Sequence, residues 1–171
     1  DQDQRFVNVR KHMGLSAAHW DADVLIWPEA ALTLFGRDAR QATNALHGQA
    51  QSSQTNVIVG MPDVQRQTGE APQFFNTVQA FGLAQGRFAK HHLVPFGEYV
   101  PLQDYLRGLI EFFDLPMSVA TRGPALQPNI RLQLPGIQHP VEVASGICYE
   151  IAYGDTLRRQ AATSGVLLTV S

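Results

Sequence analysis

The sequence predicts a layered α/β domain, and three observations support this fold class. Short apolar runs of strand length alternate along the chain with longer segments of helical pattern. Two of the strand-like runs lie on either side of Gly82–Gly86, which predicts an antiparallel hairpin in the middle of the chain. The chain has 171 residues, 44% of them hydrophobic, which is enough to bury one core. We therefore expect a single domain over residues 1–171.

The segments up to residue 91 predict two helices and four strands. The helices are expected at 5–18 and 37–53, and the strands at 24–27, 57–60, 75–81 and 87–91. Pro28 and Met61-Pro62 are expected to end the first two strands, because a proline has no N–H to donate to a neighbouring strand. Trp27, the last residue of the first strand, is expected in the core.

The remainder predicts one amphipathic helix, then strands around a second helix. Apolar residues within 102–113 recur on one helical face, and the apolar segment 112–117 is expected to pack on the domain rather than contact lipid. The other elements are expected as strands at 130–134 and 141–147, a helix at 155–164 and a buried strand at 166–170.

The composition excludes several classes of protein. Only 16% of the residues are charged and the net charge is −2, so the chain has no basic surface for nucleic acid. No apolar run approaches the roughly 20 residues that a membrane-spanning helix needs, and the first residues do not form a signal peptide. We expect the chain as given to be soluble. Its single cysteine, Cys148, cannot form an internal disulfide.

Three reactive side chains come directly after strand-like runs. Glu29 follows the strand at 24–27, and a partly desolvated carboxylate there is a usable proton acceptor. Lys90 comes at the end of the hairpin, and Cys148 follows the strand at 141–147, where a backbone N–H of the next turn can face an oxyanion. Strand ends are where sites assemble in layered α/β folds, because a rigid strand aims the side chain.

Taken singly, each of these residues has a structural explanation. Glu29 would serve as an ordinary loop carboxylate, Lys90 as a solvated cation and Cys148 as a small buried hydrophobe. Their combination points to catalysis, since a thiol nucleophile needs a base and a nearby cation. A metal site is not expected: His91 and His92 are adjacent on a strand and point to opposite faces. A serine hydrolase is not expected either, because the sequence contains no Gly-x-Ser-x-Gly motif.

The Glu-Lys-Cys order and the residues around it resemble the nitrilase (carbon–nitrogen hydrolase) superfamily. The matching motifs are Trp-Pro-Glu at Glu29, Lys-x-x-Leu-Val-Pro-Phe-Gly-Glu from Lys90 and Cys-Tyr-Glu from Cys148. Within the superfamily, the runs 92–101 and 146–150 are similar to the bacterial apolipoprotein N-acyltransferase branch. The resemblance covers nearly the whole chain and implies a four-layer α-β-β-α sandwich.

The resemblance implies a cofactor-free N-acyltransferase. A phospholipid would donate an acyl chain to Cys148, and the thioester would pass it to the α-amino group of the N-terminal diacylglyceryl-cysteine of an apolipoprotein. In this comparison Glu29 is the general base, and Lys90 stabilises the oxyanion together with the N–H of Tyr149. The resemblance further implies supporting roles for Glu98, which orients the triad, and for Tyr149 and Glu150, and substrate-binding roles for Phe6 and Tyr99.

The same resemblance carries expectations about location and completeness. Catalytic domains of this branch face the periplasm from the bacterial inner membrane, and their membrane spans are absent from this sequence. We accordingly expect a chain truncated at both ends, with little or no acyltransferase activity by itself. Two other functions remain open: a soluble nitrilase-type amidase, which would use the same triad with water as acceptor, and a non-catalytic binding or scaffolding domain.

Overall fold

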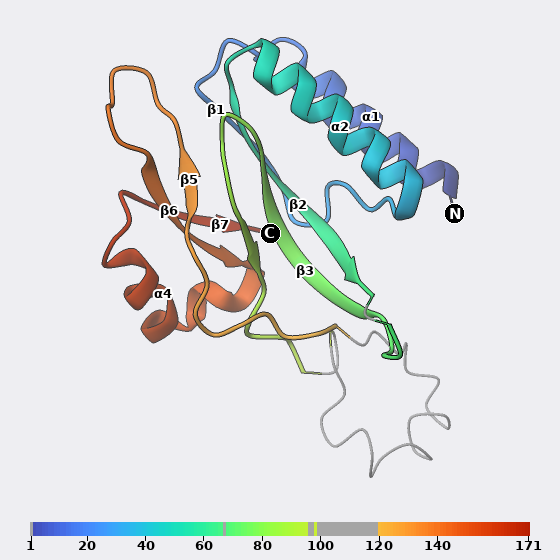
Figure 1. The fold of residues 1–171 in the computed structure, drawn as a ribbon, viewed down its shortest axis with the longest axis vertical. Helices are drawn as coiled ribbons and strands as arrows, with labels where there is room; N and C mark the ends of the chain where they lie inside the picture. The colour runs from blue at the N-terminus through green and yellow to red at the C-terminus, as the bar shows by residue number, and fades with distance from the viewer. Residues whose placement is uncertain (1, 67, 96–97, 99–119) are drawn as a thin grey trace.

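Two facing sheets with helices on their outer sides form the described part of the chain (Figure 1). The structure, a computed structural model, describes residues 2–66, 68–95, 98 and 120–171. The predicted helix at 102–113, the apolar segment 112–117 and Tyr99 lie outside these residues. From one outer side to the other, the order of layers is helices, four-stranded sheet, three-stranded sheet, helix. This arrangement confirms the expected α-β-β-α architecture.

The first sheet contains four strands in the order in which they occur in the chain. They are β1 (Val24–Trp27), β2 (Asn56–Gln65), β3 (Gln73–Gly82) and β4 (Arg87–Ala89). β1 runs parallel to β2, whereas β2, β3 and β4 are antiparallel to one another, which confirms the predicted hairpin. Helices α1 (Gln2–Ser16) and α2 (Gly36–Ser52) lie side by side over its outer face (Figure 1).

The second sheet is smaller and comes from the last third of the chain. Its strands are β5 (Ile130–Leu132), β6 (Val141–Ile147) and β7 (Val166–Val170), with β6 in the centre. β6 is antiparallel to β5 and parallel to β7. A short 3-10 helix, η1 (Cys148–Ala152), follows β6 directly, and α4 (Gly154–Ala161) then packs on the sheet.

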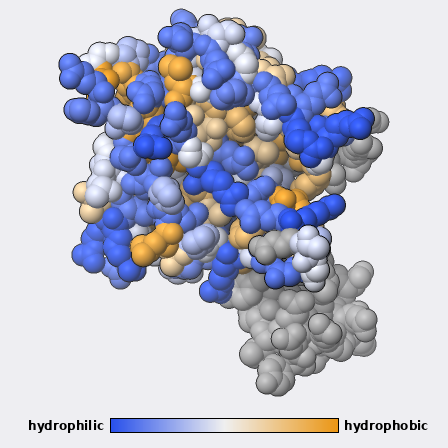
Figure 2. Space-filling model, in the orientation of Figure 1, coloured by the Kyte–Doolittle hydropathy of each residue, from blue (hydrophilic) through white to orange (hydrophobic). Residues whose placement is uncertain are grey.

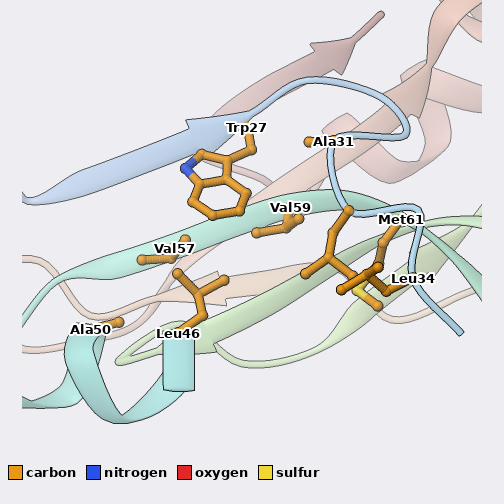
Figure 3. Close-up of a cluster of buried hydrophobic side chains, with 9 residues drawn as sticks. Trp27, Ala31, Leu34, Leu46, Ala50, Val57, Val59 and Met61 are labelled. Atoms are coloured by element: carbon orange, nitrogen blue, oxygen red, sulfur yellow. The ribbon is translucent and has the colours of Figure 1, made fainter. Parts of the chain in front are cut away.

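The outer core fills the space between the helices and the first sheet. The Trp27 ring lies beside Val57 and Val59 of β2, and Leu46 of α2 points toward them (Figure 3). Trp27 is 4% exposed, as expected of a core residue, and its Nε1–H donates a hydrogen bond to Ser16 Oγ at 2.9 Å. These contacts hold the end of β1 against α1 and thereby fix where Pro28 and Glu29 leave the sheet.

The inner core lies between the two sheets. Its buried side chains come from strands of both sheets and, at Ala84, from the β3–β4 turn: Ile58, Val78, Ala84, Phe88, Ile130, Leu132, Val143, Ile147 and Val170. A polar contact also joins the layers, since the Asn56 side chain donates to the Gln133 carbonyl at 2.8 Å and accepts from the Gln133 N–H at 2.9 Å. The inner core therefore fixes the ends of β4 and β6 relative to each other.

Two expectations about the strands are wrong. β2 continues past Pro62 to Gln65, because β1 pairs only with Asn56–Val59 and the rest of β2 is a sheet edge on that side, where proline is tolerated. β7 is not a buried strand: Val166 and Leu167 are exposed, and only Val170 is buried. Its alternate residues Leu168 and Val170 face the inner core, whereas α4 packs mainly over β6 and leaves the other face of β7 uncovered.

The surface is largely hydrophilic on the face seen in Figure 2, where apolar side chains form small separate spots. Among the described helices, none combines the length and the apolar character that crossing a membrane requires.

Candidate active site

Glu29 lies in a tight turn immediately after β1. The turn continues through Ala30 in the left-handed backbone region, with φ of 52°, and the Leu32 N–H donates to the Gly60 carbonyl of β2. A Cβ at Gly60 would stand 2.3 Å from the Pro28 carbonyl oxygen and 2.6 Å from Glu29 Cα. The absence of a side chain at Gly60 therefore allows the Glu29 turn to rest directly on β2. The Glu29 side chain remains partly exposed, at 22%.

Lys90 directly follows β4 and is 1% exposed, which makes it the largest of the fully buried side chains described. Its N–H donates to the Asn76 carbonyl of β3 and its own carbonyl accepts from the Gly123 N–H, both at 2.8 Å. Its ammonium Nζ donates to Glu98 Oε1 at 2.8 Å and lies 3.7 Å from Glu29 Oε1. A buried ammonium needs such partners, because an unpaired charge in the interior is costly.

The segment 123–127 holds the end of β4 from the other side. The Gln127 side chain accepts a hydrogen bond from the Ala89 N–H at 2.8 Å and donates one to the Ala89 carbonyl at 2.7 Å. A Cβ at Gly123 would stand 2.3 Å from the Ala89 carbonyl oxygen, so the close approach of this segment depends on the glycine. The Lys90 backbone is thus fixed on both sides.

Glu98 joins the same cluster. Its Oε1 receives the Lys90 ammonium and its Oε2 accepts the Val94 N–H at 2.8 Å. Glu98 also donates its own N–H to the Val94 carbonyl at 2.9 Å. Two carboxylates and one ammonium therefore share this part of the molecule.

Asn76, which was not among the residues predicted from the sequence, lies between the two carboxylates. Its Nδ2 donates to Glu29 Oε1 at 2.7 Å and to Glu98 Oε1 at 3.3 Å. A signal was present: the amide of Asn76 follows two phenylalanines inside the predicted strand at 75–81. Polar residues at such positions need partners, and these partners are the carboxylates of the site.

Cys148 occupies the junction of β6 and η1. Its φ of 55° is in the left-handed region, which non-glycine residues adopt rarely and at an energetic cost. This backbone turns the chain sharply from strand into 3-10 helix, at the turn that was predicted after the strand at 141–147. The Cys148 side chain is intermediate in exposure and packs against the edge of the inner core, while Tyr149 is 66% exposed.

Glu150 links the Cys148 turn to the Lys90 turn. Its carboxylate is buried and accepts three backbone N–H groups: those of His91 at 2.8 Å and His92 at 3.0 Å on Oε1, and that of Ile147 at 3.0 Å on Oε2. His91 follows Lys90 and Ile147 precedes Cys148. One side chain therefore holds the residues next to both predicted catalytic groups.

The two histidines after Lys90 pack near Tyr153, the residue that follows η1. His92 stacks on Tyr153 with ring centroids 4.0 Å apart, and His91 meets the His92 ring edge-on. Burial lowers the pKa of His92, and the neighbouring His91 lowers it further, against the opposing effect of Glu150. His92 is therefore held preferentially in its neutral form. Within the described residues, no group of three or more His, Cys, Asp or Glu side chains is arranged to hold a metal ion.

The structure brings together some of the predicted site residues and not others. Glu29, Lys90 and Glu98 form one cluster, and Glu150 connects it to the Cys148 turn. Phe6 is 36% exposed on α1 in the outer helical layer, and no described hydrogen bond, ion pair or ring contact joins it to the cluster. Its substrate-binding role stays a prediction, as does that of Tyr99.

This arrangement provides the parts for nucleophilic chemistry at a carbonyl group. Glu29 offers a partly exposed carboxylate as proton acceptor, Lys90 a buried positive charge, and Cys148 a thiol at a strained turn. Charges in a poorly solvated site interact more strongly than in water, so the Lys90 ammonium is suited to stabilising a developing negative charge.

Comparison with protein families and curated proteins gives a consistent result. The carbon-nitrogen hydrolase family model matches residues 1–171. Apolipoprotein N-acyltransferase from Pseudomonas aeruginosa (strain LESB58) is 40% identical over 171 residues, which is 100% of this chain and 32% of that protein. The enzyme of the same name from Vibrio vulnificus (strain CMCP6) is 38% identical, over 98% of this chain and 33% of that protein. The chain thus spans about one third of the length of these relatives.

Solved structures show the same fold. A carbon-nitrogen hydrolase from Helicobacter pylori G27 superimposes with a TM-score of 0.63 at 14% identity, covering 96% of this chain and 54% of the other. A mutant of the Nesterenkonia AN1 amidase, from the nitrilase superfamily, gives a TM-score of 0.57 at 16% identity, with 99% and 58% covered. With the family model matching its full length, the chain belongs to the carbon-nitrogen hydrolase family.

Proposed function

We propose that this chain is the catalytic part of an apolipoprotein N-acyltransferase, with Glu29, Lys90 and Cys148 as its catalytic residues. The observation that carries the proposal is the Lys90 ammonium, 1% exposed and set between the Glu29 and Glu98 carboxylates, with the Cys148 turn tied to it through Glu150. The choice of reaction follows the relatives of 38–40% identity, which bear the acyltransferase name.

The first step would transfer an acyl chain from a phospholipid to the enzyme. Glu29 removes the Cys148 thiol proton, and the thiolate sulfur bonds to the ester carbonyl carbon. Lys90 and the Tyr149 N–H stabilise the resulting oxyanion, each well-placed donor contributing roughly 3–4 kcal/mol. The ester C–O bond then breaks, the proton held by Glu29 passes to the departing alkoxide, and a thioester remains on Cys148.

The second step would pass the acyl chain to an amine. The neutral α-amino group of an N-terminal diacylglyceryl-cysteine attacks the thioester carbonyl carbon, and Glu29 takes the proton that the nitrogen loses. The carbon–sulfur bond breaks, an amide forms, and the Cys148 sulfur regains its proton. Donor and acceptor both carry lipid chains, so the reaction belongs at a membrane surface, which we place at the periplasmic side of the bacterial inner membrane.

A soluble amidase would use the same residues with water as acceptor. The hydrolase and amidase structures compared above are only 14% and 16% identical to this chain and inform the fold alone. The relatives of higher identity favour the transferase.

The proposal can be tested in a chimera, because the chain covers 32% of its Pseudomonas aeruginosa relative. We would replace the matching segment of that enzyme by residues 1–171 and incubate the purified chimera with phospholipid and a synthetic diacylglyceryl-cysteine peptide. Mass spectrometry should detect an acyl adduct on Cys148 and, after addition of the peptide, its N-acylated product.

Variants of the chimera separate catalysis from lipid binding. Cys148→Ser should abolish the adduct, and Glu29→Gln and Lys90→Met should each slow its formation at least about 100-fold, as expected for loss of a base or an oxyanion donor. A folded chimera that binds phospholipid but never forms the adduct would instead support a scaffolding domain. Release of free fatty acid in place of acyl peptide would support a hydrolase.

A further inference from the structure

Asn76 is an uncharged residue that, like Lys90, touches both carboxylates of the site. Its Nδ2 carries two hydrogens, one directed at Glu29 Oε1 (2.7 Å) and one at Glu98 Oε1 (3.3 Å). Both partners are acceptors, so the amide nitrogen rather than its oxygen must face them. Asn76 also accepts the Lys90 backbone N–H at its carbonyl, so one residue of β3 contacts all three charged members of the cluster.

The contacts of the two carboxylates are unequal. Glu98 is engaged at both oxygens, by Lys90 and Asn76 on Oε1 and by the Val94 N–H on Oε2. Glu29 is engaged at Oε1 only, by Asn76 and the more distant Lys90 ammonium. Within the described part of the chain, no residue donates to Glu29 Oε2. The asymmetry gives Glu98 a structural position and leaves one oxygen of Glu29 available for a proton.

Lys90 alone would not keep the contacts of Glu29 and Glu98 different. An ammonium between two carboxylates is attracted to both, and a direct contact with Glu29 would hold the base in its charged form and orient it toward the lysine. In the structure Nζ lies 2.8 Å from Glu98 but 3.7 Å from Glu29, whose near oxygen is occupied by Asn76. The amide thus satisfies Glu29 without adding charge.

We propose that Asn76 is a positioning residue that assigns the two carboxylates their separate roles. By bonding to Oε1 of Glu29, it leaves Lys90 to Glu98 and makes Oε2 of Glu29 the atom that accepts the thiol proton. The inference rests on the proposed function, since it presumes that Glu29 is the base for Cys148. A merely structural Asn76 would support β3 without affecting how Cys148 ionises.

Alkylation of Cys148 tests the proposal without any substrate. Cys148 is the only cysteine of the chain, so the rate of its modification by iodoacetamide, followed by mass spectrometry over a range of pH, reports this thiol alone. Asn76→Asp adds a third carboxylate to the cluster, and like charges disfavour one another's ionisation. The rate–pH curve of this variant should move to higher pH by about one unit.

Asn76→Ser, which keeps one hydroxyl donor, should move the curve in the same direction by less and covers the case in which the aspartate variant fails to fold. Among the described residues, the charged groups facing Asn76 are Glu29, Glu98 and Lys90. Those of the adjoining turn are His91, His92 and Glu150, with Arg122 near His92, and all remain unchanged in both variants. Asn44→Ala is the control, because Asn44 is an exposed asparagine of α2 with no contact to the cluster. Its curve should coincide with that of the wild type.

Two results would overturn the inference. The first leaves the proposed function standing, and the second overturns the proposed mechanism as well. If Glu29→Gln shifts the curve while the Asn76 variants leave it in place, Asn76 does not position the base, and the proposed function stands. If Glu29→Gln also has no effect, Glu29 does not take the thiol proton, and the proposed catalytic mechanism fails together with the role of Asn76.

Discussion

At the scale of single residues, the buried polar side chains of this molecule are held by specific partners, and those partners define the site. Lys90 is buried between two carboxylates, and Glu150 is buried against three backbone N–H groups. Neither arrangement is needed to build a core, since apolar residues of similar volume fill space at lower cost. Their presence at the ends of β4 and β6 is consistent with selection for chemistry.

His92 provides a prediction about pH at this scale. Its pKa is lowered in the folded protein from the ordinary value of 6.5, chiefly by burial. The unfolded chain therefore binds the proton more readily, so the contribution of His92 to stability is present above 6.5 and is lost as the pH falls below that value. The free energy of unfolding of the wild type should fall with acidification more steeply than that of His92→Phe, which keeps a ring against Tyr153.

Urea denaturation at a series of pH values measures this difference. If the free energies of unfolding of the wild type and of His92→Phe change equally with pH, His92 is not held neutral in the folded state.

At the scale of elements, strand ends and the turns after them decide where reactive groups are placed. The Glu29 turn rests on β2 because residue 60 has no side chain, and the Cys148 turn leaves β6 through a left-handed residue. Both are local features whose geometry depends on a neighbouring strand. A small change at such a contact should therefore displace the reactive side chain that the turn carries.

Gly60→Ala is expected to displace the Glu29 turn, because its Cβ would stand 2.3 Å from the Pro28 carbonyl oxygen. We expect a loss of about 1–3 kcal/mol in the free energy of unfolding, as for overpacked interiors, and a changed rate–pH curve for Cys148 alkylation. Gly48→Ala is the control: no atom lies within 4 Å of its added Cβ, and it stands inside α2. This second change should stabilise the protein by about 0.5–1 kcal/mol. Equal stability of the two variants would contradict the close packing of the Glu29 turn.

At the scale of the whole molecule, two cores and polar contacts between the sheets hold the described layers together. The outer core fixes β1 beneath the helices, and the inner core fixes the two sheets against each other. The Asn56 side chain adds a two-bond connection to the Gln133 backbone across the sheets. Since Glu29 and Lys90 come from the first sheet and Cys148 from the second, the site depends on how the sheets are stacked.

Asn56→Ala should weaken that stacking. It would leave the N–H and carbonyl of Gln133 without their partner, at a cost of about 1–3 kcal/mol in the free energy of unfolding. Asn44→Ala, at an exposed position of α2, serves as the comparison and should change stability by less than about 0.5 kcal/mol. Thermal or urea unfolding of both variants would measure the difference, and equal stabilities would show that the Asn56 link is dispensable.

Much of the fold was accessible from the sequence because it is encoded in local patterns. Apolar runs predicted the strands, the glycines at 82–86 predicted the hairpin, and the motifs at Glu29, Lys90 and Cys148 predicted both the family and the positions of the reactive groups. Where the prediction from sequence was wrong, the reason was also that it rested on local patterns. The apolar run 166–170 looked like a buried strand, although Val166 and Leu167 are exposed, because a sequence pattern does not reveal which face a helix covers.

The sequence by itself determined the layered α/β class, the strand ends that carry Glu29, Lys90 and Cys148, and membership of the family. Only the tertiary structure decided how these residues are held. Asn76, Gly60 and Glu150 act through contacts between segments far apart in the chain, and nothing in their local sequence identifies those partners. Local patterns set secondary structure through short-range sterics and burial, whereas the charge cluster exists only because the packed sheets bring distant strand ends together.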